Sequence, residues 1–198
     1  LSGSEIDQLL AICEKDPSPK GVRDTALIAV LRGTGMRRGE LVSLEMRDYD
    51  AKTGKFTIRQ GKGGKFREVY LVQEAKPWLK EWLSLRSQAS KTGPLFCRIR
   101  RGGHLHPETH MDGGSIFRIL EERREQIEEM DMEHFSPHDL RRTLCSELLE
   151  VEDIATVQQI AGHASPATTV KYDRRGDKAK KRAANKVGFR KPQTPFNE

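Results

Sequence analysis

The sequence contains few cysteines and no long apolar run. Cys13, Cys97 and Cys145 lie far apart and form no C-x-x-C pair, which excludes a disulfide framework and a zinc ribbon and favours buried, reduced thiols of a cytoplasmic protein. No stretch of about 18 apolar residues predicts a transmembrane helix. No apolar segment follows a basic start, so a secretory signal is not predicted. Because residue 1 is Leu1, we expect an excised domain or a processed chain.

Charge of one sign is concentrated in particular segments. The 198 residues predict one domain, or one with a small appendage, and carry a net charge of +6. Residues 171–191 hold ten basic and two acidic residues, a net of +8, so the rest of the chain sums to −2. Residues 55–67 contain five basic residues and no acid, whereas residues 121–133 are acidic. If the basic segments share one face, they predict a polyanionic partner, although solvated surface charge is an equally good interpretation.

Hydrophobic periodicity predicts a mostly helical domain with one small antiparallel sheet. Ser4 and Asp7 form a capping-box pattern that opens a helix to about residue 15. Residues 56–58 and 67–71 are β-rich and flank the glycine-rich segment 61–64, which is typical of a hairpin. Further helices are expected in these ranges: 26–33, 38–44, 74–85, 114–130, 137–149, 153–161, 166–172 and 177–187. Residues 191–198 are expected to form a loose tail.

Two predicted helix starts lie next to histidines that are candidate functional residues. Ser136-Pro137-His138-Asp139 and Ser165-Pro166 both place Ser at the N-cap and Pro at N1. The helix that Ser136 would cap carries His138 and Arg141 on one face of its first turn. This placement at a helix N-terminus favours an anion, although an H-x-x-R pair by itself is most often a surface pair.

Two glycine-rich segments also offer cationic groups. The turn at residues 33–41 presents Arg37 and Arg38, and Glu40 stands at i+3 from Arg37, where it could orient that arginine. A helix C-cap followed by a solvated salt bridge is the alternative. Residues 61–65, with Lys62 and Lys65, would let a phosphate approach the backbone, but they lack the Walker A pattern. A basic turn without a ligand is the alternative there.

Other histidines and a tyrosine stand further along the chain. His104, His106 and His110 make metal binding conceivable, but the glycine-rich segment and the missing helical spacing favour a solvated loop, so we expect no metal. Gly162-His163 closes a predicted helix, and Tyr172 follows nine residues after His163. A single tyrosine is more often a packing residue than a nucleophile.

Taken together, these motifs resemble the tyrosine recombinase (phage integrase) family in order and spacing. The matching segments are T34-G-M-R-R-G-E-L, G61-K-G-G-K-F-R, H138-D-L-R-R-T and A161-G-H…Y172, and the resemblance extends over about residues 4–187. Arg142 stands where His is common, and Ala161-Gly162 replaces a frequent Leu-Gly. The resemblance implies an α+β, mainly helical catalytic domain over residues 1–190 with a small three-stranded antiparallel sheet. It also implies a separate N-terminal DNA-clamping domain, which we expect to be absent from this chain.

The resemblance assigns roles to individual residues. Arg37 and Arg141 would bind non-bridging oxygens of the scissile phosphate, and Lys62 would protonate the leaving 5′-oxygen. His138 would bond the phosphate and help to take the proton of the nucleophile, Tyr172, while His163 would bond a non-bridging oxygen. Glu40 would support Arg37. Four further residues would contact DNA: Arg38, Lys65, Arg67 and Arg142.

The activity implied is site-specific DNA recombination or integration through a 3′-phosphotyrosyl intermediate, without a metal, ATP or other cofactor. Two guanidinium groups suit the charge that develops on a phosphodiester, and the aryl ester keeps the bond energy for rejoining. The expected partners are double-stranded DNA and further copies of the chain in a tetrameric synapse. A type IB topoisomerase-like relaxing enzyme and a non-catalytic DNA-binding protein are the alternatives.

Overall fold

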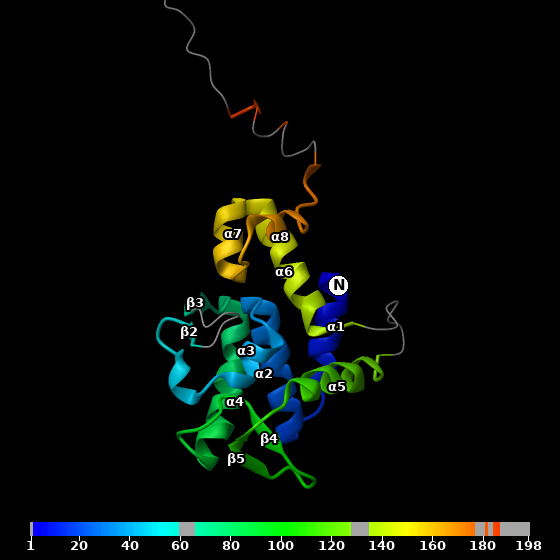
Figure 1. The fold of residues 1–198 in the computed structure, drawn as a ribbon. Coiled ribbons are helices and arrows are strands. Elements are labelled where there is room, and N and C mark those ends of the chain that lie inside the picture. The colour runs from blue at the N-terminus through cyan, green and yellow to red at the C-terminus, as the bar shows by residue number, and fades with distance from the viewer. Residues whose placement is uncertain (1, 60–65, 128–134, 177–180, 182–183, 187–198) are drawn as a thin grey trace, which may run out of the picture.

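The fold is α+β and mainly helical, as the sequence predicted (Figure 1). A computed structural model describes residues 2–59, 66–127, 135–176, 181 and 184–186. The N-terminal part contains α1 (Gly3–Glu14), α2 (Pro19–Thr34), α3 (Arg38–Ser43), β1 (Tyr49–Asp50), β2 (Lys55–Ile58) and β3 (Arg67–Tyr70). It is followed by α4 (Lys76–Ala89), β4 (Cys97–Ile99), β5 (Leu105–His110), α5 (Gly113–Arg124), α6 (Pro137–Val151), α7 (Ile154–Ala161) and α8 (Pro166–Val170).

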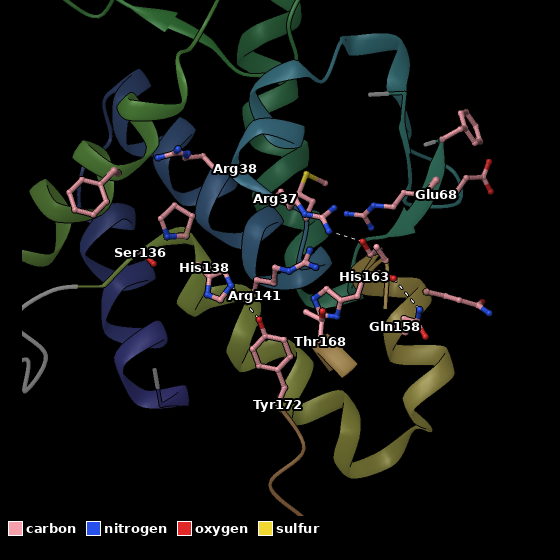
Figure 2. Close-up of a pocket in the computed structure, with 18 residues that line it drawn as sticks. Arg37, Arg38, Glu68, Ser136, His138, Arg141, Gln158, His163, Thr168 and Tyr172 are labelled. Atoms are coloured by element: carbon pink, nitrogen blue, oxygen red, sulfur yellow. Dashed lines mark hydrogen bonds between the residues drawn. The ribbon is translucent and has the colours of Figure 1, made fainter. Parts of the chain in front are cut away.

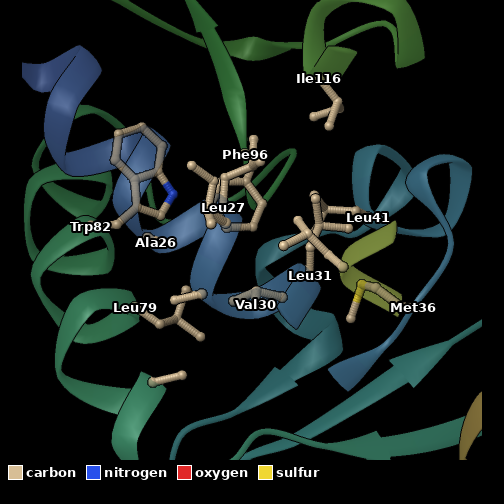
Figure 3. Close-up of a cluster of buried hydrophobic side chains, with 14 of the residues drawn as sticks. Ala26, Leu27, Val30, Leu31, Met36, Leu41, Leu79, Trp82, Phe96 and Ile116 are labelled. Carbon is tan, nitrogen blue, oxygen red and sulfur yellow. The ribbon is translucent and has the colours of Figure 1, made fainter. Parts of the chain in front are cut away.

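Helix α2 runs through the middle of the main hydrophobic core. Its apolar side chains, Leu27, Ile28, Val30 and Leu31, are almost completely buried, because α1, α4 and α6 pack around it. Figure 3 shows several of them facing Trp82 and Phe96. The Trp82 indole donates a 2.9 Å hydrogen bond to the Leu95 carbonyl, which satisfies its buried N–H. A buried central helix therefore leads directly into the Gly35 turn that precedes α3.

The strands form two small antiparallel sheets. The expected sheet is confirmed: its order is β1-β2-β3, with Phe56 opposite Tyr49 on one side and Val69 on the other. The solvated loop expected at His104, His106 and His110 is wrong for His106 and His110, which lie on β5 where it pairs with β4 as a second sheet, whereas His104 lies in the exposed turn between the two strands. Strand β5 is partly buried in its first half and exposed in its second, and it contains a proline, so no apolar alternation marks it in the sequence.

Some predicted helix ends also differ. Helix α1 begins two residues earlier than predicted, because Ser2 caps the Glu5 N–H and Glu5 accepts from the Ser2 backbone. Helix α5 ends at Arg124 rather than near residue 130. The helix predicted at 177–187 falls mostly outside the described residues, and so does the tail predicted at 191–198. The three cysteines are buried, as expected.

A second, smaller apolar cluster lies at the end of the molecule where Figure 1 places α7 and α8. It joins Cys145 and Leu149 of α6 to Val157 and Ala161 of α7, and the Tyr172 ring packs against it. Helix α6 connects the two clusters, because Leu140 near its start belongs to the main core. In the described part of the chain, no helix is long and apolar enough to cross a membrane.

Candidate active site

A cavity of ≈ 1180 Å³ lies between the two apolar clusters. It brings together five of the six expected catalytic residues, which point into it from α2–α3, α6, the α7 end and the segment after α8 (Figure 2). These five are Arg37, His138, Arg141, His163 and Tyr172. Lys62 and Lys65 lie outside the described residues. Residues far apart in the sequence thus meet at one solvent-accessible site.

Arg37 is held by the start of α3 and by the end of α7. Its backbone N–H donates to Glu40 Oε2 (2.7 Å), and its Nη1 donates to Glu40 Oε1 (2.8 Å). Its Nη2 donates to the Gly162 carbonyl at 2.6 Å. Burial by itself would raise the pKa of Glu40, but the bonds from Arg37 and the charge of Arg67 outweigh it, so the pKa of Glu40 lies below its usual value. Glu40 is therefore an anionic support for the guanidinium.

Arg141 is almost completely buried, at 4% exposure. Its Nη1 donates to the Gly35 carbonyl (2.7 Å) and its Nη2 to the Ala161 carbonyl (2.6 Å). Helix ends leave carbonyls without intrahelical donors and carry partial negative charge, so a guanidinium is well placed there. Burial and the charge of Arg37 lower the pKa of Arg141, yet a guanidinium stays charged at neutral pH.

The last carbonyls of α7 bind one arginine each. Arg67 on β3 donates from Nη1 to the Ile160 carbonyl (2.7 Å) and from Nη2 to Glu40 Oε2 (2.6 Å). Three consecutive carbonyls therefore accept from three different elements, in the pairs Ile160–Arg67, Ala161–Arg141 and Gly162–Arg37. These bonds connect the second apolar cluster to the rest of the fold, at a point next to His163.

His163 is neutral at physiological pH. Burial and the charges of Arg141 and Arg37 lower its pKa to about 4. Its Nδ1 lies 2.9 Å from the Thr169 hydroxyl, and its backbone N–H and C=O both bond to Gln158. In the tautomer in which Thr169 donates to Nδ1, Nε2 carries the proton and is available to an anion.

Tyr172 faces His138 across the cavity. The Tyr172 hydroxyl lies 3.3 Å from His138 Nε2, and its ring stacks on His163 with a centroid separation of 5.6 Å. The Tyr172 N–H bonds to the Thr169 carbonyl at 2.9 Å, so the short helix α8 sets the position of the ring. His138 stands in the first turn of α6, where the predicted N-cap Ser136 is confirmed and Asp139 completes a capping box with it. A phenol and a ring nitrogen that can accept its proton are thereby held together.

The remaining predicted residues occupy different environments. Arg38 is exposed and lines the cavity, and Arg142 is exposed on α6. Arg67, expected to contact DNA, also lines the cavity, and its side chain is largely covered and bonded to protein acceptors. Sequence reasoning missed Thr169 and Gln158, which orient His163. A threonine and a glutamine in helical segments are so common that no sequence signal separated them from their neighbours.

Gly162 is expected to tolerate no side chain. Its φ of +64° is strained for other residues, and an added Cβ would lie 2.6 Å from Arg67 Nε. We expect Gly162→Ala to lower the free energy of unfolding by about 2–4 kcal/mol, combining backbone strain with overpacking. Gly102→Ala is the matched control, because its φ is +85° but its nearest contact is 3.4 Å. Denaturant unfolding should show a loss of only about 1–2 kcal/mol there; equal losses would contradict the predicted clash.

Comparison with known proteins agrees with this geometry. The sequence matches the Phage integrase family over residues 1–178. It is 31% identical to tyrosine recombinase XerC of Vibrio cholerae over 173 residues, which are 87% of this chain and 52% of that protein. It is 33% identical to tyrosine recombinase XerA of Pyrococcus furiosus over 194 residues, covering 96% of this chain and 62% of that one. The chain thus spans about half the length of the XerC relative.

Solved structures show the same architecture. A crystal structure of XerA recombinase superimposes with a TM-score of 0.71 at 28% identity, covering 96% of this chain and 66% of that one. A crystal structure of XerH site-specific recombinase bound to its difH substrate superimposes with a TM-score of 0.71 at 26% identity, covering 94% of this chain and 53% of that one. The fold is therefore that of a tyrosine recombinase catalytic domain. The chain belongs to the phage integrase family.

Proposed function

We propose that this chain is the catalytic part of a site-specific DNA recombinase or integrase that cleaves and rejoins strands through a 3′-phosphotyrosyl link. The observation that carries the proposal is the Tyr172 hydroxyl, 3.3 Å from His138 Nε2 in a cavity that also contains Arg37 and Arg141. A nucleophile next to a base, facing two fixed cations, is the arrangement that attack on an anionic diester requires.

The cleavage step transfers two protons, one from the Tyr172 hydroxyl and one to the leaving 5′-oxygen. Tyr172 Oη attacks the phosphorus and its proton passes to His138 Nε2, which needs the tautomer with the other proton on Nδ1. The bond between phosphorus and the 5′-oxygen breaks as the tyrosyl ester forms. The 5′-oxygen leaves with a proton from Lys62, the general acid that the family resemblance implies. The ester retains the bond energy, so rejoining to a DNA 5′-hydroxyl consumes no nucleotide.

The cations and His163 act on the non-bridging oxygens. Each guanidinium has five N–H donors, and the contacts of Arg37 and Arg141 to carbonyls and to Glu40 leave others for a phosphate. Because the arginines are already oriented, little reorganisation is needed when charge develops. Neutral His163 would donate from Nε2 without adding a charge to the crowded cationic site.

A suicide duplex, nicked so that the cleaved fragment diffuses away, tests this proposal. We expect a covalent protein–DNA complex that survives denaturation and forms without added metal or nucleotide. Binding without any covalent complex would overturn the enzymatic proposal in favour of a DNA-binding protein. Double-stranded DNA and further copies of the chain, assembled as a tetrameric synapse, are the proposed partners. Strand transfer between two recognition duplexes is expected, whereas relaxation of supercoils without transfer would favour a topoisomerase-like enzyme.

Lys62→Ala is expected to be rescued by a changed leaving group. A 5′-bridging phosphorothiolate leaves as a thiolate and needs no general acid. Single-turnover cleavage of this substrate should therefore be nearly normal in Lys62→Ala. It should be severely slowed in Arg37→Ala, which still lacks the guanidinium that stabilises the charge on the non-bridging oxygens. Equal rescue of both variants, or of neither, would contradict the general-acid role of Lys62.

A further inference from the structure

We propose that Arg67 is a positioning residue of the active site and not a DNA contact: it holds Glu40 against Arg37 and fixes the end of α7 that carries His163. The inference rests on the proposed function, because its consequence is measured as DNA cleavage. It replaces the expectation that Arg67 contacts DNA.

Arg67 lines the cavity, and both terminal nitrogens of its guanidinium bond to protein acceptors. Its side chain is 13% exposed, whereas that of Arg37 is 32% exposed. Both terminal nitrogens bond to fixed oxygens, at Ile160 and Glu40. Its Nε is buried without an acceptor in the described part of the chain, and Gly162 packs directly against it. A phosphate therefore has no direct route to Nε, while Arg37 remains accessible.

Arg67 determines where Glu40 can sit. Glu40 is buried, and its Oε1 is occupied by Arg37 Nη1, while its Oε2 accepts from Arg67 and from the Arg37 backbone. Because a buried carboxylate is costly unless it is well paired, the two arginines hold it in one orientation. Removal of Arg67 leaves Oε2 with a single backbone donor. The carboxylate can then rotate, and the orientation of Arg37 changes with it.

Arg67 also connects the sheet to α7. The Ile160 carbonyl that it binds is two residues before Gly162, whose carbonyl binds Arg37, and three before His163. A shift of this turn would move an acceptor of Arg37 and the ring of His163 together. Preorganised electrostatic groups lose much of their effect when displaced by about 1 Å, so the consequence should appear in the rate of cleavage rather than in DNA affinity.

Two substitutions separate positioning from phosphate contact. Arg67→Met removes the charge, and Arg67→Lys keeps the charge but cannot bond to both oxygens as a guanidinium fork does. For positioning, we expect single-turnover cleavage at saturating DNA to fall about 10- to 100-fold in both variants, as for a lost charged hydrogen bond. DNA affinity and its salt dependence should stay unchanged. Retained cleavage in Arg67→Lys, together with a salt slope reduced by about 0.9 in Arg67→Met, would establish a phosphate contact and overturn the proposal.

A control and a double-variant cycle exclude a purely structural role. Arg123 is also buried and bonds to Asp24 and Asp16, but it does not line the cavity. Arg123→Met should lower the thermal unfolding midpoint while leaving cleavage at a permissive temperature within about twofold. Arg67→Met combined with Glu40→Gln should lose less than the product of the two single losses, because both act through one contact. Independent losses, or an equal cleavage defect in Arg123→Met, would overturn the positioning role.

Failure of the proposed function has a different signature. If the unaltered chain forms no covalent complex with the suicide duplex, the function is wrong, whatever the Arg67 variants do. If the unaltered chain cleaves and Arg67→Met cleaves equally fast, only the role of Arg67 is wrong.

Discussion

Tyr172→Phe is expected to bind duplex DNA within about threefold of the unaltered chain and to form no covalent complex. The substitution removes the atom that would form the ester and keeps the ring, which packs on the α6–α7 cluster and stacks on His163. The lost contact to His138 is a long hydrogen bond at 3.3 Å, so its removal should cost no more than about 1 kcal/mol of stability. Denaturing electrophoresis after incubation with the suicide duplex measures the adduct.

The matched control for this substitution is Tyr70→Phe. Tyr70 lies on β3 with its side chain largely exposed and does not line the cavity. This variant should form the adduct at the rate of the unaltered chain. The sequence contains three tyrosines, so a residual adduct in Tyr172→Phe could be assigned by peptide mapping to another of them. Such an adduct would show that the nucleophile is misassigned.

Arg141→Lys should reduce the cleavage rate by about 10²–10³-fold, while DNA binding falls only modestly. Lysine keeps the positive charge but carries its three donors on a single nitrogen, so it cannot bond to the Gly35 and Ala161 carbonyls and present a planar fork to the phosphate at once. A loss of one oriented donor to a transition-state oxyanion has this magnitude. Single-turnover cleavage at saturating DNA isolates the chemical step from binding.

Arg32→Lys provides the comparison for Arg141→Lys. Arg32 on α2 pairs with Glu147 on α6, so it also connects these two helices, but it does not line the cavity. A partly exposed ion pair contributes little, and we expect cleavage within about twofold of the unaltered chain. A loss of less than about tenfold in Arg141→Lys would mean that Arg141 only stabilises the packing of α6.

The motifs of the site were readable from the sequence because their chemistry is local. The motif Ser136-Pro137-His138-Asp139 predicts where α6 begins and which side chains lie in its first turn. The structure confirms that Ser136 is the N-cap. The spacing of Arg37 and Glu40 likewise predicts their ion pair, since both lie within one helical turn. The pairing of β2 with β3 followed from β-rich residues on either side of a glycine-rich segment.

Features that depend on distant partners were not readable. Strand β5 has no apolar alternation, because it pairs at the surface, and Arg67 looked like one more cation in a basic segment. Its partners, Glu40 and the Ile160 carbonyl, lie 27 and 93 positions away in the sequence. The backbone carbonyl is the same in every residue, so no sequence pattern predicts which carbonyls will bind a guanidinium.

The sequence by itself determined the residue types, the helix starts and the order of the motifs, because capping, periodicity and spacing act within a few residues. Only the tertiary structure decided that Arg37, Arg67 and Arg141 share the carbonyls that end α7, and that His163 between them is neutral. The physical reason is burial. Packing α6 and α7 against α2 and β3 removes water from these groups, and each cation must then find a fixed acceptor, which makes the geometry of the site a property of the whole fold.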